Sequence, residues 1–252
     1  MRIHCFQHIP WHGRAFIPSW AAGAGHDWQV TLVPEADRLP RPESFDALII
    51  MGGPMSLRER DQHPWLLAEQ RLLEDVLRRG QPFLGICLGA QMLAAVHGAA
   101  VRRGRHSEIG WYPLQLTDEG RDTWLGDILP DGLETFFWHD DVFETPTDAV
   151  RIAGTEASPH QAFVAGTALG LQFHLEVTSE WAAHLARRDA VQLVPSRYVQ
   201  SAIDILGRPA SSYEQNNAVM AALLERWLGL ATAADAPSNR AVAGSAGPVL
   251  GG

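Results

Sequence analysis

Cysteine is scarce in this chain: its 252 residues include only Cys5 and Cys87. Two cysteines cannot build the disulfide framework on which small secreted domains depend, so we expect a reducing, cytoplasmic setting. Long apolar runs are missing too. No stretch approaches the roughly 20 residues of a membrane-spanning helix, and residues 1–8 are too polar for a signal peptide. The sequence therefore predicts neither a secreted nor a membrane protein.

Positive charge is in the minority, with 20 Lys and Arg against 29 Asp and Glu and a formal net charge of −9 at pH 7. An acidic chain is repelled by phosphate backbones and anionic lipid surfaces, so we expect neither nucleic acid nor a membrane as a partner. The short basic cluster of Arg102, Arg103 and Arg105 beside His106 is interpreted as a solvated loop. Hydrophobic residues make up 46% of the chain, enough for a sizeable core.

Apolar runs alternate with amphipathic segments in the first hundred residues. The predicted strands are 3–6, 30–33, 44–51 and 83–87, and the predicted helices are 63–79 and 90–97. Strands that alternate with helices favour an α/β fold with a mainly parallel central sheet and helices on both faces. Segments 99–116 and 133–173 resemble a small antiparallel addition that leads into a last strand at 169–174.

The C-terminal part changes in composition. Residues 179–230 predict a helical extension, broken near Pro195, Gly207 and Pro209. Residues 231–252 are Ala, Gly, Ser and Pro with little to bury, which predicts a disordered tail. We expect one domain over 1–230, no internal repeat, and the chemical motifs within about 1–185.

The most informative motif is GICLG at 85–89, which ends an apolar run and precedes an Ala-rich helical stretch. Glycines two residues to either side of Cys87 let the chain turn sharply from strand to helix and expose the side chain between them. At the start of a helix, unpaired N–H groups and the macrodipole favour a thiolate. Alone, the motif fits either a buried structural cysteine or a nucleophile that attacks carbonyl carbon.

Two further motifs give Cys87 a context. In QFHLE at 172–176, an extended backbone would turn His174 and Glu176 to the same side. A histidine within reach of a cysteine can take its proton, and a carboxylate on the other ring nitrogen supports the imidazolium. In GGPMS at 52–56, glycines that follow a buried strand can present N–H groups to an oxyanion. Each motif alone also fits an ordinary polar pair or a tight turn.

Together, GGPMS, GICLGAQ and QFHLE resemble the class I (triad) glutamine amidotransferases. The resemblance extends to 108–111 (EIGW), 138–141 (WHDD) and 156–158 (EAS), in the family's order. It is nearest to the stand-alone, GMP-synthase-like members, which include γ-glutamyl peptidases. The resemblance implies a flavodoxin-like three-layer sandwich and requires no cofactor or metal.

The resemblance also implies roles for individual residues. Cys87 would attack the γ-carboxamide carbon of L-glutamine or of another γ-glutamyl amide, with a γ-glutamyl thioester as the intermediate. His174 would act first as base and then as acid, and Glu176 would orient it. The oxyanion would be held by the backbone N–H groups of Gly53 and Leu88. The expected substrate-binding residues are Gln91, Trp138, His139 and Asp140.

Two positions depart from the family's pattern. Leu175 stands where proline usually separates the catalytic His and Glu, which removes a restraint on φ. Asp140 stands where the family commonly has the glycine of His-Gly-Asp, and aspartate tolerates a left-handed backbone better than most residues. We expect these departures to bear on specificity more than on activity, because no catalytic group is lost.

Several functions remain open at this point. The chain could release ammonia for a synthetase that is a separate polypeptide, since it carries no P-loop or PP-motif. It could instead hydrolyse γ-glutamyl amides on its own, or bind a metabolite without catalysis. Papain-like signatures around the cysteine are absent, and a DJ-1-like protein is not expected to carry both GGP and QFHLE.

A metal site is a further candidate on His4, His8 and His12, which lie four residues apart. On one helix they would form a stripe, but His4 lies in a predicted strand and Pro10 interrupts the run. Zinc needs three or four converging ligands, so no metal is expected. Cys5 is interpreted as a buried strand residue.

Overall fold

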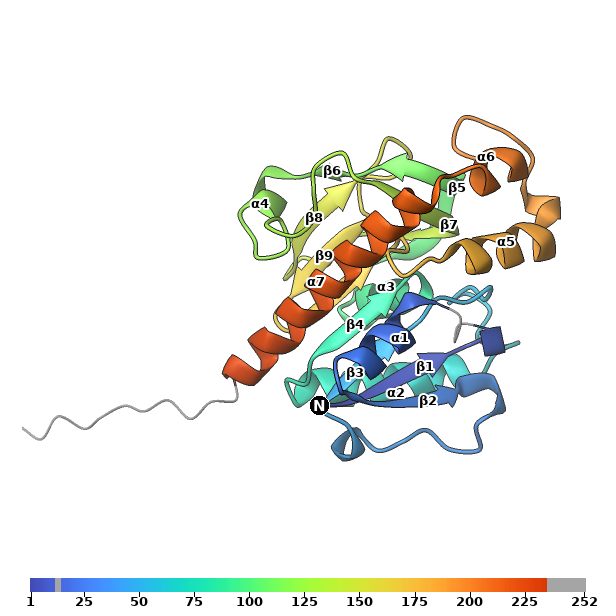
Figure 1. The fold of residues 1–252 in the computed structure, drawn as a ribbon. Coiled ribbons are helices and arrows are strands. Elements are labelled where there is room, and N and C mark those ends of the chain that lie inside the picture. The colour runs from blue at the N-terminus through green and yellow to red at the C-terminus, as the bar shows by residue number, and fades with distance from the viewer. Residues whose placement is uncertain (12–14, 235–252) are drawn as a thin grey trace, which may run out of the picture.

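A mixed, mostly parallel sheet forms the centre of the computed structural model, which describes residues 1–11 and 15–234 (Figure 1). Eight strands within these residues follow the order β2-β1-β3-β4-β10-β9-β8-β6. Their bounds are Arg2–Gln7 (β1), Asp27–Leu32 (β2), Ala47–Ile50 (β3), Phe83–Ile86 (β4), Gln115–Leu116 (β6), Val150–Gly154 (β8), Ala162–Ala165 (β9) and Ala168–Leu171 (β10). Pairing is parallel from β2 through β10 and antiparallel from β10 to β6. The predicted α/β class is confirmed.

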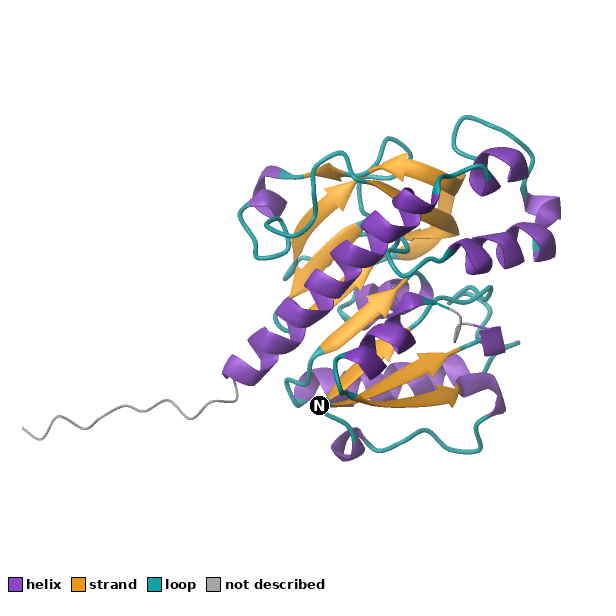
Figure 2. Ribbon diagram, in the orientation of Figure 1, coloured by secondary structure: helices purple, strands orange, loops and turns teal. Residues whose placement is uncertain are grey.

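A second, two-stranded antiparallel sheet joins β5 (Val101–Pro113) to β7 (Glu134–Phe143), with a register shift between Arg103 and Glu108. It lies beside the carboxyl ends of the parallel strands (Figure 2). The link between the two sheets is direct, because the backbone N–H of His174 donates to the carbonyl oxygen of Phe136 at 2.8 Å. This pair of strands is the antiparallel addition that the sequence predicts.

Helices cover both faces of the large sheet (Figure 2). Their bounds are Phe16–Gly23 (α1), Trp65–Arg78 (α2), Leu88–Val96 (α3), Asp118–Arg121 (α4), Ser179–Arg188 (α5), Ala202–Leu206 (α6) and Ala210–Ala234 (α7), with 3-10 turns at Val33–Glu35, Pro42–Ser44 and Ala190–Gln192. Alternate strand residues face opposite ways. Ile3 and Ile49 pack in the core with α1 and α7, whereas Phe6 and Ile50 pack with α2 and α3. The strands are therefore buried on both faces, which explains their continuous apolar runs.

Some predicted boundaries differ from the observed ones. The strand expected at 30–33 is β2, which begins at Asp27, and α1 was not predicted at all. The last strand was expected to reach residue 174, but β10 ends at Leu171. The N–H of Gln172 still donates to the carbonyl oxygen of Gln161 at 2.8 Å, and the chain leaves the large sheet after it, where the N–H of His174 pairs with β7 instead.

The C-terminal helix α7 continues to Ala234, past residue 231 where the tail was expected to begin. The remainder of the predicted tail, 235–252, lies outside the described residues. Among the helices that the structure describes, none is both long and apolar enough to cross a membrane.

Candidate functional site

The turn at Cys87 has the strained geometry of a nucleophile elbow. Cys87 has φ +53°, and among the described residues it is the one non-glycine residue with positive φ. A Cβ on Gly85 would lie 2.4 Å from the backbone of Gly89, and a Cβ on Gly89 would lie 2.1 Å from the carbonyl oxygen of Ile50. Both flanking glycines are therefore required by close packing of the turn against β3 and α3. Strain of this kind persists only where the surroundings enforce it.

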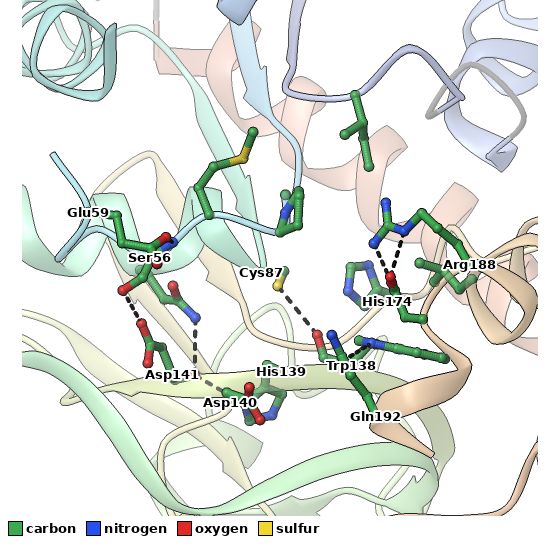
Figure 3. Close-up of a pocket in the computed structure, with 18 of the residues that line it drawn as sticks. Ser56, Glu59, Cys87, Trp138, His139, Asp140, Asp141, His174, Arg188 and Gln192 are labelled. Atoms are coloured by element: carbon green, nitrogen blue, oxygen red, sulfur yellow. Dashed lines mark hydrogen bonds and ion pairs between the residues drawn. The ribbon is translucent and has the colours of Figure 1, made fainter. Parts of the chain in front are cut away.

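Hydrogen bonds to neighbouring elements hold the elbow in place. The N–H of Cys87 donates to the carbonyl oxygen of Leu171 at 2.7 Å, at the end of β10. The N–H of Gln91 donates to the carbonyl oxygen of Cys87 at 3.0 Å, so the sulfur sits at the start of α3. Leu88 is the first residue of that helix, where backbone N–H groups have no partner within the helix. The Cys87 side chain lines a cleft (Figure 3).

His174 and Glu176 form a buried pair beside Cys87. His174 Nδ1 lies 2.7 Å from Glu176 Oε1, and their side chains are 4% and 0% exposed. A Cβ on Gly52 would lie 3.2 Å from Cys87 Cβ and 3.4 Å from His174 Cε1, so the cysteine and the histidine meet at this glycine. Burial disfavours the imidazolium, but the charge of Glu176 and hydrogen bonds to Cys87 and Glu176 outweigh it and raise the pKa of His174 to about 10.

The segment that carries this pair is fixed without the proline that the family usually has. Asn217 of α7 donates from Nδ2 to the carbonyl oxygens of Leu175 and Val177, at 2.9 Å each. The N–H of Phe16 donates to the carbonyl oxygen of Glu176 at 2.9 Å. The Leu175 side chain is fully buried in the core. Packing and three hydrogen bonds therefore restrain the backbone on both sides of Glu176.

A cleft with a volume of about 210 Å³ opens above Cys87 and His174 (Figure 3). Its apolar lining residues are Ile9, Trp11, Trp138, Trp181 and Leu185. Its polar and charged lining residues include Ser56, Arg58, Glu59, Arg103, Asp140, Asp141, Arg188, Asp189 and Gln192. The two kinds are interspersed, because the Arg188 guanidinium lies 4.6 Å from the centroid of the Trp11 ring.

The predicted substrate residues lie in this cleft, but they face it in different ways. The carbonyl oxygen of Trp138 lies 3.9 Å from Cys87 Sγ, while the indole N–H donates to Gln192 Oε1 at 2.9 Å. Gln91 is buried, and its Nε2 donates to the carbonyl oxygen of Asp141 at 3.1 Å. The backbone carbonyl of Trp138 therefore lies beside the sulfur, whereas the Gln91 side chain is held in position by the backbone of Asp141.

His139 and Asp140 are tied to β5 by their side chains. His139 Nε2 lies 3.2 Å from Glu108 Oε2, and both residues are buried. The hydroxyl of Ser107 donates to Asp140 Oδ1 at 2.5 Å, and Arg103 Nη2 lies 3.4 Å from Asp140 Oδ2. The extra carboxylate of Asp140 is thus partnered at the rim of the cleft rather than left beside the sulfur.

A polar cluster that sequence reasoning missed stands on the other side of the cleft. The Ser56 hydroxyl donates to Asp141 Oδ2 at 2.5 Å, and Arg58 Nη2 donates to Asp141 Oδ1 at 2.8 Å. The N–H of Ser56 donates to Glu59 Oε2 at 2.9 Å. Ser56 and Asp141 are the last residues of GGPMS and WHDD, but no signal in the sequence indicated that they meet, because their contact depends on the fold.

The remaining candidates do not assemble into a site. His4 Nε2 lies 2.8 Å from Thr31 Oγ1, His8 pairs with Glu69, and His12 is outside the described residues. Within the described part of the chain, no group of three or more His, Cys, Asp or Glu side chains is arranged to hold a metal. Cys5 is fully buried, and burial raises the pKa of its thiol well above the ordinary range.

Comparisons with known proteins identify the family to which the chain belongs. The family model of the class-I glutamine amidotransferases matches residues 22–192. The glutamine amidotransferase-like protein YfeJ of Salmonella typhimurium is 30% identical over 225 residues, which cover 86% of this chain and 93% of that protein. One subunit of the glutamine-hydrolysing GMP synthase of Sulfurisphaera tokodaii is 36% identical over 138 residues, which cover 54% of this chain and 69% of that polypeptide.

A solved structure supports the same relationship. The glutamine amidotransferase of Thermotoga maritima superposes with a TM-score of 0.82 at 30% identity, over 90% of this chain and 98% of that one. The chain belongs to the class I glutamine amidotransferase family. Members of this family are typically amidohydrolases.

Proposed function

We propose that the chain is an amidohydrolase that cleaves the γ-carboxamide of glutamine, or of a γ-glutamyl amide, through a γ-glutamyl thioester on Cys87. The observation that carries this proposal is the convergence of three separate segments at Gly52. The strained elbow brings Cys87 there, the segment after β10 brings His174, and the turn after β3 supplies the backbone between them. A binding protein would need none of these three features together.

In the first half of the reaction, the Cys87 thiolate attacks the γ-carbonyl carbon of the substrate. His174 acts first as the base that holds the Cys87 proton, because its raised pKa keeps the imidazole protonated at neutral pH, and this cation attracts the thiolate. The negative charge moves to the carbonyl oxygen, where the N–H groups of Gly53 and Leu88 would donate to it. His174 then gives its proton to the leaving nitrogen as the C–N bond breaks, and ammonia or an amine departs.

In the second half, water attacks the thioester carbonyl carbon. Neutral His174 takes a proton from this water, and the C–S bond breaks to release glutamate and the Cys87 thiolate. Glu176, 2.7 Å from Nδ1, orients the ring and stabilises the imidazolium in both halves. His174 keeps the proton that it took from water and the new γ-carboxyl group loses its own proton to solvent, so the enzyme regains its starting imidazolium–thiolate state.

A stand-alone activity on γ-glutamyl amides is a second candidate, favoured by the aromatic residues that line the cleft. Besides Cys87, the lining includes Trp11, Trp138, Trp181 and Leu185. Free glutamine loses only ammonia, whereas a larger amine could pack against these side chains. Transfer of ammonia to a synthetase on a separate polypeptide is the other form of the same chemistry.

The test is a kinetic screen of the purified chain. Ammonia release from glutamine and amine release from a series of γ-glutamyl amides are measured for the parent and for Cys87→Ala. We expect Cys87→Ala to abolish turnover of every substrate that the parent cleaves. Turnover by Cys87→Ala at the parent's rate would contradict the proposed mechanism.

A further inference from the structure

A second buried histidine–carboxylate pair lies directly behind the Gly52–Gly53 turn. His8, just after β1, has both side-chain nitrogens in contact with acceptors: Nδ1 lies 2.8 Å from the carbonyl oxygen of Gly52, and Nε2 lies 3.1 Å from each carboxylate oxygen of Glu69. The side chains of His8 and Glu69 are both 0% exposed. The His8 ring also stacks on Trp65 at 5.3 Å. The His8 ring is thus held from several sides.

The identity of these partners determines the charge of His8. A carbonyl oxygen and a carboxylate can only accept hydrogen bonds, so both ring nitrogens must donate. A histidine that donates from both nitrogens is an imidazolium. Burial disfavours this cation, but the charge and hydrogen bonds of Glu69 and the carbonyl oxygen of Gly52 outweigh burial and raise the pKa of His8. The bond to Gly52 is therefore charge-assisted, and such bonds are roughly twice as strong as neutral ones.

The geometry of the peptide bond carries this restraint into the cleft. The peptide that joins Gly52 and Gly53 is planar and trans, so its C=O and its N–H point in opposite directions. The Gly52 carbonyl oxygen points at His8, whereas the side of Gly52 on which a Cβ would stand faces Cys87 and His174. The Gly53 N–H is consequently turned to the side on which Cys87 and His174 meet Gly52.

Glycines at both positions leave this peptide free to rotate unless something holds it. Gly53 packs tightly on the histidine, since a Cβ there would lie 3.0 Å from His8 Cβ. Gly52 faces the opposite way, toward the sulfur. The turn is therefore flexible by composition and fixed by its contact with His8.

We propose that His8 and Glu69 are positioning residues that lock the Gly52–Gly53 peptide with the Gly53 N–H directed at the oxyanion. This role rests on the proposed function, because it has a consequence only if an oxyanion forms at Cys87. Neither residue touches the substrate: Glu69 holds His8, and His8 holds the peptide. Their effect falls on the transition state, where negative charge develops, rather than on ground-state binding.

The test compares two amide side chains at position 8 in a Glu69→Gln background, which removes the buried carboxylate that would otherwise lose its partner. Asparagine places an amide N–H near the position of Nδ1 and can still donate to the Gly52 carbonyl. Glutamine places its amide near the position of Nε2 and cannot. His4→Asn is the matched control, because His4 is also a buried histidine of this segment but bonds Thr31.

We expect His8→Gln in this background to lower kcat by about 100-fold, the usual effect of losing one oxyanion donor. KM should change by less than about threefold, because the oxyanion is absent from the ground state. His8→Asn should stay within about tenfold of the Glu69→Gln enzyme, and His4→Asn should keep the parent's kcat. Iodoacetamide should alkylate Cys87 at the same rate in all of them, since this reaction forms no oxyanion.

Equal kcat for the Asn and Gln variants would overturn the role of His8. If the Gln variant does not fold, as judged by its thermal melt, His8→Leu in the same background replaces it as the variant without a donor. If the parent enzyme shows no turnover that Cys87→Ala abolishes, the proposed function itself is contradicted. The two failures are therefore distinguishable.

Discussion

Asn217→Ala should lower both the stability and the activity of the protein, and the loss of activity should exceed what the loss of stability explains. Asn217 donates to the carbonyl oxygens of Leu175 and Val177, at 2.9 Å each, and so restrains the backbone on both sides of the carboxylate. A typical intramolecular hydrogen bond contributes about 1 kcal/mol net, so losing both should cost about 2 kcal/mol of unfolding free energy. For a chain of this size that corresponds to a fall of roughly 4–8 °C in Tm.

The effect on catalysis should exceed what the loss of stability explains. His174 Nδ1 and Glu176 Oε1 are 2.7 Å apart, and displacement of a catalytic group by about 1 Å can cost about 100-fold in rate. We expect Asn217→Ala to lower kcat by about tenfold, measured well below its melting temperature with the best substrate of the screen.

Asn216→Ala is the matched control. Its Nδ2 donates to the carbonyl oxygens of Glu134 and Ser212, at 2.9 and 3.0 Å, and not to the segment that carries His174 and Glu176. Thermal melts should show a comparable loss of Tm in both variants, while kcat falls only for Asn217→Ala. The reasoning would be refuted if both variants kept the parent's kcat, or if both lost it equally.

Two further predictions concern the elbow and its histidine. Gly89→Ala should prevent folding or lower Tm sharply, because its Cβ would lie 2.1 Å from the Ile50 carbonyl oxygen. The control Gly23→Ala should leave Tm unchanged or slightly higher, because a Cβ there would have nothing within 4 Å. Equal Tm values for the two variants would contradict the packing argument. Glu176 helps raise the folded-state pKa of His174, so the stability gained from this pair is fully present below about pH 6.5 and is lost as pH rises through about 10. The free energy of unfolding in urea should differ less between the parent and His174→Asn at about pH 10.5 than at about pH 6. A difference that stays constant over this range would count against the stabilising pair.

The elbow could be predicted from the sequence because its constraints are local. Gly85 and Gly89 flank the cysteine, and each lies where a Cβ would collide with backbone. His174 and Glu176 were also predictable as a pair, since they are two residues apart. Their pairing does not require a continuous strand: β10 ends at Leu171, and the bridge to Phe136 supplies the extended backbone at His174.

The supporting contacts could not be predicted in the same way. His8 and Glu69 are separated by 61 positions, and the bonds of Asn217 span 40 and 42 positions. No local pattern distinguishes a glutamate inside an amphipathic helix that faces solvent from one that faces a buried imidazole. Helix α1 was missed for a related reason: it is only 8 residues long and has no side-chain cap, so its stability comes from packing against β-strands and α7.

The central claim, a covalent γ-glutamyl intermediate on Cys87, is tested most directly by intact-mass and peptide mass spectrometry after incubation with 6-diazo-5-oxonorleucine, an electrophilic glutamine analogue. Cys5 serves as the internal control, because it is fully buried and burial raises the pKa of its thiol. We predict a single adduct on Cys87 that glutamine or a cleaved γ-glutamyl amide protects against. An unmodified Cys87, in a protein whose Cys87 still reacts with iodoacetamide, would contradict the account.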